Sequence, residues 1–329
     1  MLRRLVVVGL LFAATPAMAQ LESTTLPANG EVEPPAATPP PFAIPGASQS
    51  ARTFVRSVFD TDFKDGGGSA DRFTTGASLG FDSGFLSLDG SRPASPQDIS
   101  GPLVSVAGSF TFRYHSWDLD NLGPQGRAVG LPDDLLEDAY VFSFNPRLSV
   151  ALDKQSSLAA GAFLAFEFED GADVGDAFIP GGFIGYRREF NRNVVVTTGV
   201  VAFYLLDDSF FVVPLLAINV DYGDDAFFLT SEGLGARTGY RFGSDIALSV
   251  GGEFIGNNFR LQSDGILEQQ AVRLDVGVDW TPSRAMTVSA RVGGDVWGQY
   301  IVSDESGREV FDVEVEPGAA ATLEVRFRR

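Results

Sequence analysis

The chain has 329 residues, a formal net charge of −19 and no cysteine. A strongly acidic chain is a poor partner for nucleic acid, whose phosphates need a basic surface. Disulfides and thiolate metal sites are excluded, and no cofactor is expected. Lys64 and Lys154 are the only lysines, so almost every positive charge is an arginine.

The first residues predict export. Met1-Leu2-Arg3-Arg4 is basic, residues 5–14 are apolar, and Ala17-Met18-Ala19 places small residues at a cleavage position. This is the order of a secretory signal peptide. The apolar run is too short for an uncleaved helical anchor, which needs about 20 residues. We therefore predict a signal peptide over residues 1–19, cleaved near Ala19.

The next segment, residues 20–51, is rich in proline and poor in large apolar side chains. Glu33-Pro34-Pro35 and the run Thr38 to Pro41 are typical of it. Such a stretch buries too little surface to offset its ordering entropy. We interpret it as a disordered linker. A periplasmic tether that binds a partner such as peptidoglycan is the alternative, and no motif supports it.

From residue 52 to residue 329, apolar and polar residues alternate. In the run Val272 to Trp280, the even positions are Val, Leu, Val, Val and Trp, and the odd positions are Arg, Asp, Gly and Asp. The same period recurs in 104–114, 286–293 and 321–327. A period of two indicates strands whose two faces meet different environments.

The strands separated by turn signals are long, as membrane-crossing strands are. Their polar faces carry charges of both signs, and aromatic residues gather near their ends, as in the girdles of outer-membrane barrels. We predict a single transmembrane, antiparallel, up-and-down β-barrel of about 12 strands, with about 10 to 14 allowed. A soluble periplasmic all-β binding protein is the alternative. The predicted girdle residues are Tyr114, Trp117, Tyr140, Tyr240, Trp280, Trp297, Tyr300 and Phe327.

Turn signals divide this region into candidate strands. The alternation of short and long connections requires 226–243 to be two short strands bent at Gly233 to Gly235. Segments 52–63 and 73–88 then either lie outside the barrel or add to it. The candidate strands are 73–88, 102–117, 138–153, 155–168, 178–190, 193–206, 210–222, 226–243, 245–262, 268–281, 285–302 and 309–327.

These features together resemble bacterial outer-membrane β-barrel proteins. Within that class the chain looks most similar to an uncharacterised barrel family, a domain of unknown function, on Phe178-Ile179-Pro180-Gly181-Gly182 and Gly239-Tyr240-Arg241-Phe242. The resemblance implies a place in the outer membrane of a Gram-negative cell, in contact with lipid and lipopolysaccharide. It also implies assembly by machinery that reads an aromatic residue in the last strand. Phe327 fits this register, although Arg328-Arg329 follow it.

Through the alternation, a set of charged residues is predicted to face the lumen. Mixed charges at close range pair well when the cation is arginine, because its planar fork binds carboxylates. The set forms either an ion-pair network in a structural barrel or a narrow polar channel for small solutes, and barrel size alone does not decide between them. Its members are Arg113, Arg147, Glu167, Arg187, Glu189, Arg237, Arg241, Glu253, Arg273, Asp275, Asp279, Arg291, Asp295, Glu324 and Arg326.

We predict that the chain is not an enzyme. Gly76-Ala77-Ser78-Leu79-Gly80 has the spelling of a nucleophile elbow, but that motif works on a strand-to-helix turn and here lies in an alternating segment. His115 is the only histidine, so a barrel-embedded hydrolase, the alternative, would have to use it as its base.

Two acidic connections are candidate Ca²⁺ sites, because clustered carboxylates supply the oxygen ligands that this ion prefers. Neither has EF-hand spacing, and we interpret them as solvated loops. The acidic residues are Asp118, Asp120, Asp133, Asp134, Glu137 and Asp138 in one, and Glu169, Asp170, Asp173 and Asp176 in the other.

Overall fold

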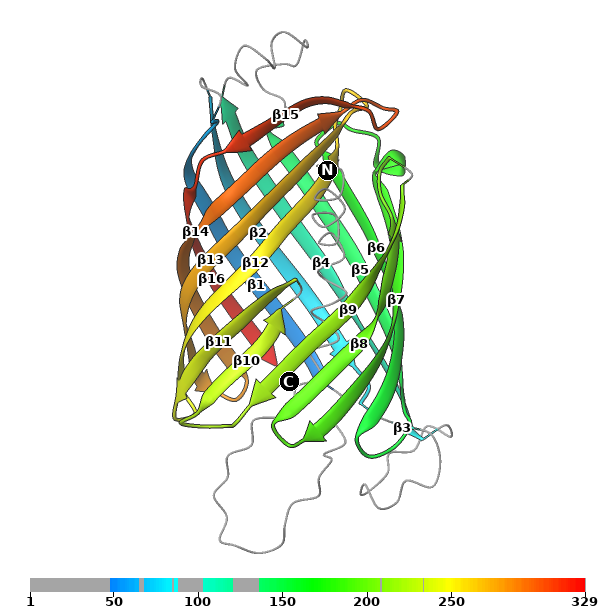
Figure 1. Ribbon diagram of the computed structural model, residues 1–329, viewed down its shortest axis with the longest axis vertical. Coiled ribbons are helices and arrows are strands. Elements are labelled where there is room, and N and C mark those ends of the chain that lie inside the picture. The colour runs from blue at the N-terminus through cyan, green and yellow to red at the C-terminus, as the bar shows by residue number, and fades with distance from the viewer. Residues whose placement is uncertain are drawn as a thin grey trace, which may run out of the picture.

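The computed structural model describes residues 48–64, 68–84, 86–87, 103–120, 136–207, 209–232 and 234–328, which form long strands (Figure 1). A short 3-10 helix, η2 (Val174–Ala177), precedes β7. Within these ranges no helix has the length and apolar character needed to cross a bilayer. The strands are β1 (Ser48–Asp62), β2 (Ser69–Asp82), β3 (Leu86–Ser87), β4 (Leu103–Asp120), β5 (Asp138–Ala151), β6 (Ser156–Glu169), β7 (Phe178–Asn191), β8 (Val194–Tyr204), β9 (Phe210–Asp221), β10 (Phe227–Glu232), β11 (Gly235–Phe242), β12 (Ile246–Arg260), β13 (Ile266–Ser283), β14 (Met286–Ser303), β15 (Glu309–Val315) and β16 (Gly318–Arg328).

Antiparallel pairing closes these elements into one up-and-down barrel of 14 strands. Consecutive strands pair, and β1 closes the ring against β16. β15 and β16 together make the last barrel strand, because β14 pairs with β16 along its first half and with β15 along its second. Pro317 separates the two halves; it has no backbone N–H and cannot continue the ladder.

The expected fold class is confirmed, and the strand number lies at the upper limit of the expected range. The segment from Ser48 belongs to the barrel as β1, and 226–243 is indeed two short strands, the hairpin β10–β11. Residues 1–47, which hold the predicted signal peptide and most of the predicted linker, lie outside the described residues.

The two ends of the barrel differ. One end, where β1 begins and β16 finishes, has short connections such as 192–193 and 284–285; we call it the turn end. The other end has longer connections such as 121–137 and 170–177; we call it the loop end. Outer-membrane barrels place short turns in the periplasm and longer loops outside the cell, so this alternation matches that class.

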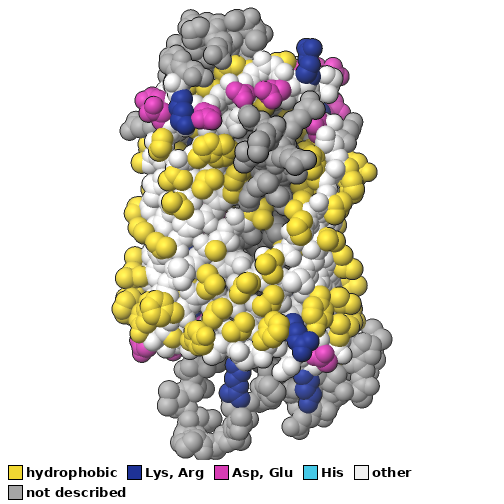
Figure 2. Space-filling model, in the orientation of Figure 1, with side chains coloured by type: hydrophobic (Ala, Val, Ile, Leu, Met, Phe, Trp, Pro, Cys, Tyr) yellow, Lys and Arg dark blue, Asp and Glu magenta, His cyan; other side chains and the backbone are white. Residues whose placement is uncertain are grey.

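The outer face of the wall is apolar. Val250, Val276 and Val292 lie side by side on β12, β13 and β14, and each is more than half exposed. Figure 2 shows hydrophobic side chains across the middle of the visible face, with acidic and basic side chains gathered at its two ends. A band of exposed apolar side chains between two charged rims is the surface that a membrane barrel presents to lipid.

Val276→Arg is therefore expected to destabilise the barrel in lipid vesicles by about 2–4 kcal/mol, because it places a cation on the apolar band. Ser283→Arg, at the turn end of the same strand, is the control and is expected to have an effect of about 0–1 kcal/mol. Urea titration of the folded and unfolded gel bands measures both. Equal effects of the two variants would mean that Val276 does not face lipid.

Near the loop end, the wall narrows. β12 leaves β11 after Gly252, and its tip pairs in parallel with β6 at Arg260↔Phe168. β15 meets β1 through the bridge Phe63↔Val315. The strands β1, β2, β4, β5, β6, β12, β13, β14 and β15 thus form a smaller ring at this end, and side chains fill such narrow rings. Its interior is a core of buried residues that includes Leu136, Phe259, Leu261 and Val313.

Two predicted girdle residues belong to this core. Trp117 and Tyr300 are 5% and 7% exposed, and their rings meet edge to face at 5.6 Å between centroids. The girdle prediction is wrong for both. Trp117 follows the outward Tyr114 by three residues, and Tyr300 follows the outward Trp297 by three. An odd interval along a strand turns the side chain to the opposite face.

Candidate functional site

The lumen is lined by ion pairs on one side. Each of the fifteen charged residues predicted to face it takes part in at least one ion pair. Arg273 holds Asp295 through two hydrogen bonds of 2.7 and 2.9 Å, and Arg237 holds Asp275 through two of 2.7 and 3.1 Å. All four side chains are buried, so these are bidentate pairs removed from solvent.

Glu324 is the centre of a second group. Its carboxylate lies 2.6 Å from Arg52, 2.8 Å from Arg326 and 3.6 Å from Arg291, and Arg291 also reaches Asp279 at 3.6 Å. Glu324 is 1% exposed. A buried carboxylate is tolerated only when it is paired, and here three arginines from β1, β14 and β16 surround it.

Five members of these pairs were not predicted from the sequence: Arg52, Arg56, Arg72, Asp82 and Asp221. Arg52 and Arg56 lie on β1, which had no assigned place in the barrel, and Arg72 precedes the candidate strand 73–88. The register itself was the available signal, because extending the alternation backwards from Phe73 places Arg72 on the lumen face.

The opposite wall of the lumen is apolar. Inward side chains of β6, β7, β8 and β9 form one buried cluster, which includes Phe163, Phe183, Val201, Phe203 and Leu215. Two charged residues of β7, Arg187 and Glu189, lie closer to the turn end than this cluster. They pair with each other at 2.9 Å. The lumen therefore has a charged side and an apolar side.

The backbone ladder is interrupted between β9 and β12. The hairpin β10–β11 is short, and β10 pairs with β9 only from Phe228↔Asp221 to Thr230↔Asn219. Next to this pairing, Ser231 Oγ accepts a hydrogen bond from the N–H of Ile218 on β9 and donates one to its C=O. Among the residues described, 210–217 of β9 and 253–259 of β12 have no ladder partner on the sides that face this hairpin. Figure 1 shows the hairpin stopping well below the loop-end tips of both strands.

The unpaired stretch of β9 is apolar on both faces. Val212 and Leu216 are exposed on the outside, at 60% and 64%, whereas Val213 and Leu215 are buried on the lumen side. Pro214 lies between them, and proline without its N–H is found on edge strands rather than within a continuous sheet. This part of the wall therefore offers apolar side chains to the lumen, to the outside and at its edge.

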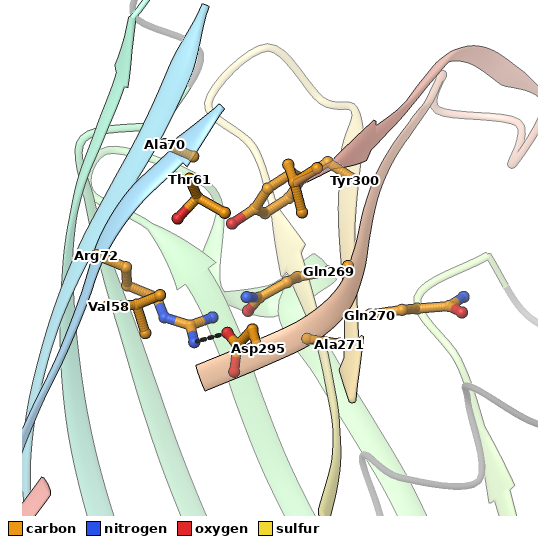
Figure 3. A pocket seen from close by; sticks show the side chains of 11 residues that line it. Val58, Thr61, Ala70, Arg72, Gln269, Gln270, Ala271, Asp295 and Tyr300 are labelled. Carbon is orange, nitrogen blue, oxygen red and sulfur yellow. Dashed lines mark ion pairs between the residues drawn. The ribbon is translucent and has the colours of Figure 1, made fainter. Parts of the chain in front are cut away.

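A small pocket lies where the charged side meets the loop-end core. Arg72, Asp295, Gln269, Tyr300 and Thr61 contribute its polar groups. Figure 3 shows the Arg72 guanidinium directed toward Asp295 and Gln269, with Tyr300 and Thr61 above it. Ala70, Tyr300 and Val315 belong to both the pocket and the core, so the pocket lies directly against the filled end of the barrel.

Three predicted girdle residues lie on the outer face near the turn end. Trp280 and Phe327 are about half exposed there, and the hydroxyl of Tyr240 donates to the backbone carbonyl of Asp225 at 2.7 Å. An exposed ring with its polar group near a turn is the arrangement of an interfacial girdle.

Three more lie farther toward the loop end. The rings of Tyr114 and Tyr140 are 5.6 Å apart, and the Tyr114 hydroxyl donates to Asp138 at 2.6 Å. The Trp297 ring packs on Phe254 at 6.1 Å. Cross-strand aromatic contacts of this kind stabilise neighbouring strands as well as anchoring them.

His115 has no acid partner among the described residues. Its Nδ1 lies 3.0 Å from Thr74 Oγ1, and its ring contacts Phe259 edge to face at 5.5 Å. It is buried in the wall of the filled end, and the Gly76–Gly80 spelling lies inside β2. Neither feature has the geometry of a nucleophile activated by an oriented base.

The acidic residues predicted as Ca²⁺ candidates have other contacts where they are described. Asp173 accepts a hydrogen bond from Gly175 N and starts η2, and Glu169 Oε2 accepts from Gln262 N at 2.6 Å. Within the described ranges no group of three or more Asp, Glu or His side chains is placed to hold a metal ion. Asp133 and Asp134 lie outside those ranges.

No protein-family model and no curated protein matches the chain. Solved structures with similar folds include an outer membrane channel from Pseudomonas putida F1, which is 10% identical, with 90% of this chain and 100% of that chain covered and a TM-score of 0.45. The toluene transporter TodX of P. putida is 10% identical over 87% and 90% of the two chains, with a TM-score of 0.33. The translocator domain of the autotransporter NalP from Neisseria meningitidis is 10% identical over 96% and 98%, with a TM-score of 0.31.

Proposed function

We propose that this chain is an outer-membrane channel that carries small apolar or amphipathic molecules along the apolar side of its lumen and releases them sideways between β9 and β12. The observation that carries this proposal is the stretch 210–217 of β9, which lacks a ladder partner on one side and is apolar on both faces. Among the described residues, no backbone ladder closes the wall there.

The ion pairs argue against the simpler hypothesis of a polar channel. A polar solute needs unsatisfied donors and acceptors along its path, whereas each of the fifteen predicted lumen charges is engaged in an ion pair. Arginine–carboxylate pairs of this geometry hold each other firmly and leave few sites for exchange. The named members of the apolar cluster of β6 to β9 are all uncharged, so no ion pair among them competes with a solute for contacts.

The filled loop end also favours a lateral exit. Phe259 and Leu261 at the tip of β12 are fully buried in the core there, and Arg260 is fixed by hydrogen bonds to the carbonyls of Leu206 and Asp264. A solute that travels along the barrel axis would have to displace this core. Passage between two edge strands breaks no ladder hydrogen bond among the described residues.

The location of the protein is part of the proposal. The signal peptide, cleaved near Ala19, would deliver the chain to the assembly machinery, with Phe327 in the last strand as the aromatic residue that is read. The apolar band would then contact lipid and lipopolysaccharide. Membership of an uncharacterised barrel family, suggested by Phe178–Gly182 and the Gly239–Phe242 strand, remains a hypothesis.

The test is uptake of N-phenyl-1-naphthylamine, an apolar dye that intact lipopolysaccharide excludes, by Gram-negative cells that express the chain. We expect expression to raise the rate of dye entry. Val213→Cys and Ile255→Cys introduce thiols on the two unpaired edges, and the chain has no cysteine of its own to interfere. Joining them with a reversible bis-thiol cross-linker is expected to lower dye entry, and reduction is expected to restore it.

Each single-cysteine variant, treated with the same reagent, is the control. Dye entry that survives the cross-link would contradict a lateral exit at this place. Ion conductance in planar bilayers without any dye entry would contradict the apolar route as a whole and support the polar channel instead.

A further inference from the structure

On the charged side of the lumen, one connected group of arginines and carboxylates lacks electrical balance. Arg56 lies 3.0 Å from Glu253, Arg273 lies 3.8 Å from Glu253 and pairs with Asp295, and Arg72 lies 3.6 Å from Asp295. The chain of contacts thus joins three guanidinium groups to two carboxylates. Arginine does not lose its proton in proteins, so the group carries an excess positive charge.

The excess is concentrated at Arg72. Its side chain is 4% exposed, and its only ion-pair contact within the described chain, at 3.6 Å, is too long for a hydrogen bond. Both oxygens of Asp295 accept hydrogen bonds from Arg273, so most of the charge of this carboxylate is already matched by another arginine. Nε and Nη1 of Arg72 have no hydrogen-bond partner among the described residues, and one face of the guanidinium lies on the Trp117 ring, 5.1 Å from its centroid.

The small pocket described above opens beside this guanidinium. Gln269 and Tyr300 lie across it from Arg72, with Thr61 at its edge (Figure 3). Hydroxyl and amide groups can all donate hydrogen bonds. The pocket is thus lined by a buried cation with two N–H groups that lack partners, by further donors, and by the Asp295 carboxylate, whose charge is offset by its bidentate pair with Arg273. We infer that it is a site for a negatively charged ligand.

We propose that this pocket binds one small monovalent anion, of the size of a halide ion or a compact carboxylate, held chiefly by Arg72. An unpaired charge in a low-dielectric interior is strongly unfavourable, and an anion removes both the excess charge and the idle N–H groups. A water molecule would satisfy the hydrogen bonds but leave the charge, and an apolar solute would satisfy neither.

The position gives the site a role distinct from the lateral route. It lies on the charged side of the lumen, against the filled loop end, and away from the apolar cluster of β6 to β9. An anion bound here completes the network that ties β1, β2, β12, β13 and β14 together. It stabilises the closed end of the barrel and does not travel through the wall.

The direct test is diffraction from crystals of the detergent-solubilised protein grown with bromide in place of chloride. We expect an anomalous peak in the pocket, in contact with Arg72 Nε or Nη1. A pocket that holds only water, or no density, in the wild-type protein overturns the proposal. This readout does not depend on conduction, so it fails or succeeds independently of the lateral channel.

A second measurement uses heat-modifiable migration at constant ionic strength. The unfolding midpoint of the wild-type protein is expected to rise and saturate as bromide or chloride replaces gluconate, which is too large for the pocket. Arg72→Gln is expected to abolish this rise. Arg241→Gln removes a lumen arginine whose partner, Asp221, is half exposed, and is expected to keep the full response. An equal loss in both variants would overturn the assignment to Arg72.

Discussion

Arg273→Met is expected to lower the free energy of unfolding by about 3–5 kcal/mol. The Arg273 side chain is 2% exposed, it donates two hydrogen bonds to Asp295, and its loss leaves that buried carboxylate with only the long contact to Arg72. Urea unfolding in phospholipid vesicles, followed by the gel mobility of the folded band, measures the change.

The double variant Arg273→Met with Asp295→Leu separates pairing from packing. It removes both members of the pair but also takes away the only ion-pair contact of Arg72 within the described chain, so we expect it to recover part of the loss. Lys64→Met is the exposed control: its pair with Glu314 is about half exposed on both sides, and the expected change is about 0–1 kcal/mol. An Arg273→Met effect as small as that of Lys64→Met would show that solvent screens the lumen network.

The period of two in hydrophobicity predicted the barrel well, because successive side chains of a strand between lipid and lumen face these two environments in turn. The strands that escaped detection are those with a weak contrast between faces. The outward residues of β1 are Ala51, Thr53, Val55, Ser57 and Phe59, which is an apolar face with two polar interruptions. Its place in the barrel follows from ladder closure against β16, a contact between the two ends of the chain that no local pattern encodes.

The ion-pair partners within the lumen could not be predicted from the sequence for a similar reason. Glu324 meets Arg52, which lies at the other end of the chain, and Glu253 meets Arg56. Alternation predicts that these side chains point inward, but the partner depends on register and strand tilt across the barrel. The structure brings together charges that the sequence only placed on one face.

The apolar side of the lumen has a signal in the sequence, which is a local loss of alternation. From Val194 to Ile218 the apolar residues run on with little alternation. Asp207 to Ser209 and Pro214 interrupt the run, so it does not have the pattern of a membrane-spanning helix. In a membrane barrel, a strand that is apolar on both faces meets lipid on one side and an apolar interior on the other. Loss of alternation in β9 therefore marks the wall that the proposed function uses.

Leu215→Asn is expected to reduce the entry of the apolar dye about tenfold or more. Leu215 faces the lumen within the apolar cluster, and an amide there lies in the path without a hydrogen-bond partner of its own. Burial of an unsatisfied amide is unfavourable by about 1–3 kcal/mol, and about 1.4 kcal/mol corresponds to a factor of ten. The measurement is the initial rate of dye entry, normalised to the amount of heat-modifiable protein in the outer membrane.

Leu216→Asn is the matched control, since it makes the same chemical change one residue later on the opposite face of β9, where the side chain is 64% exposed. We expect it to weaken insertion slightly and to leave dye entry per folded barrel unchanged. If solutes instead move along the charged side, both variants will conduct alike, because neither alters an arginine or a carboxylate. A difference between two adjacent residues can only come from the face that each presents, and the lumen face is the one the proposed route requires.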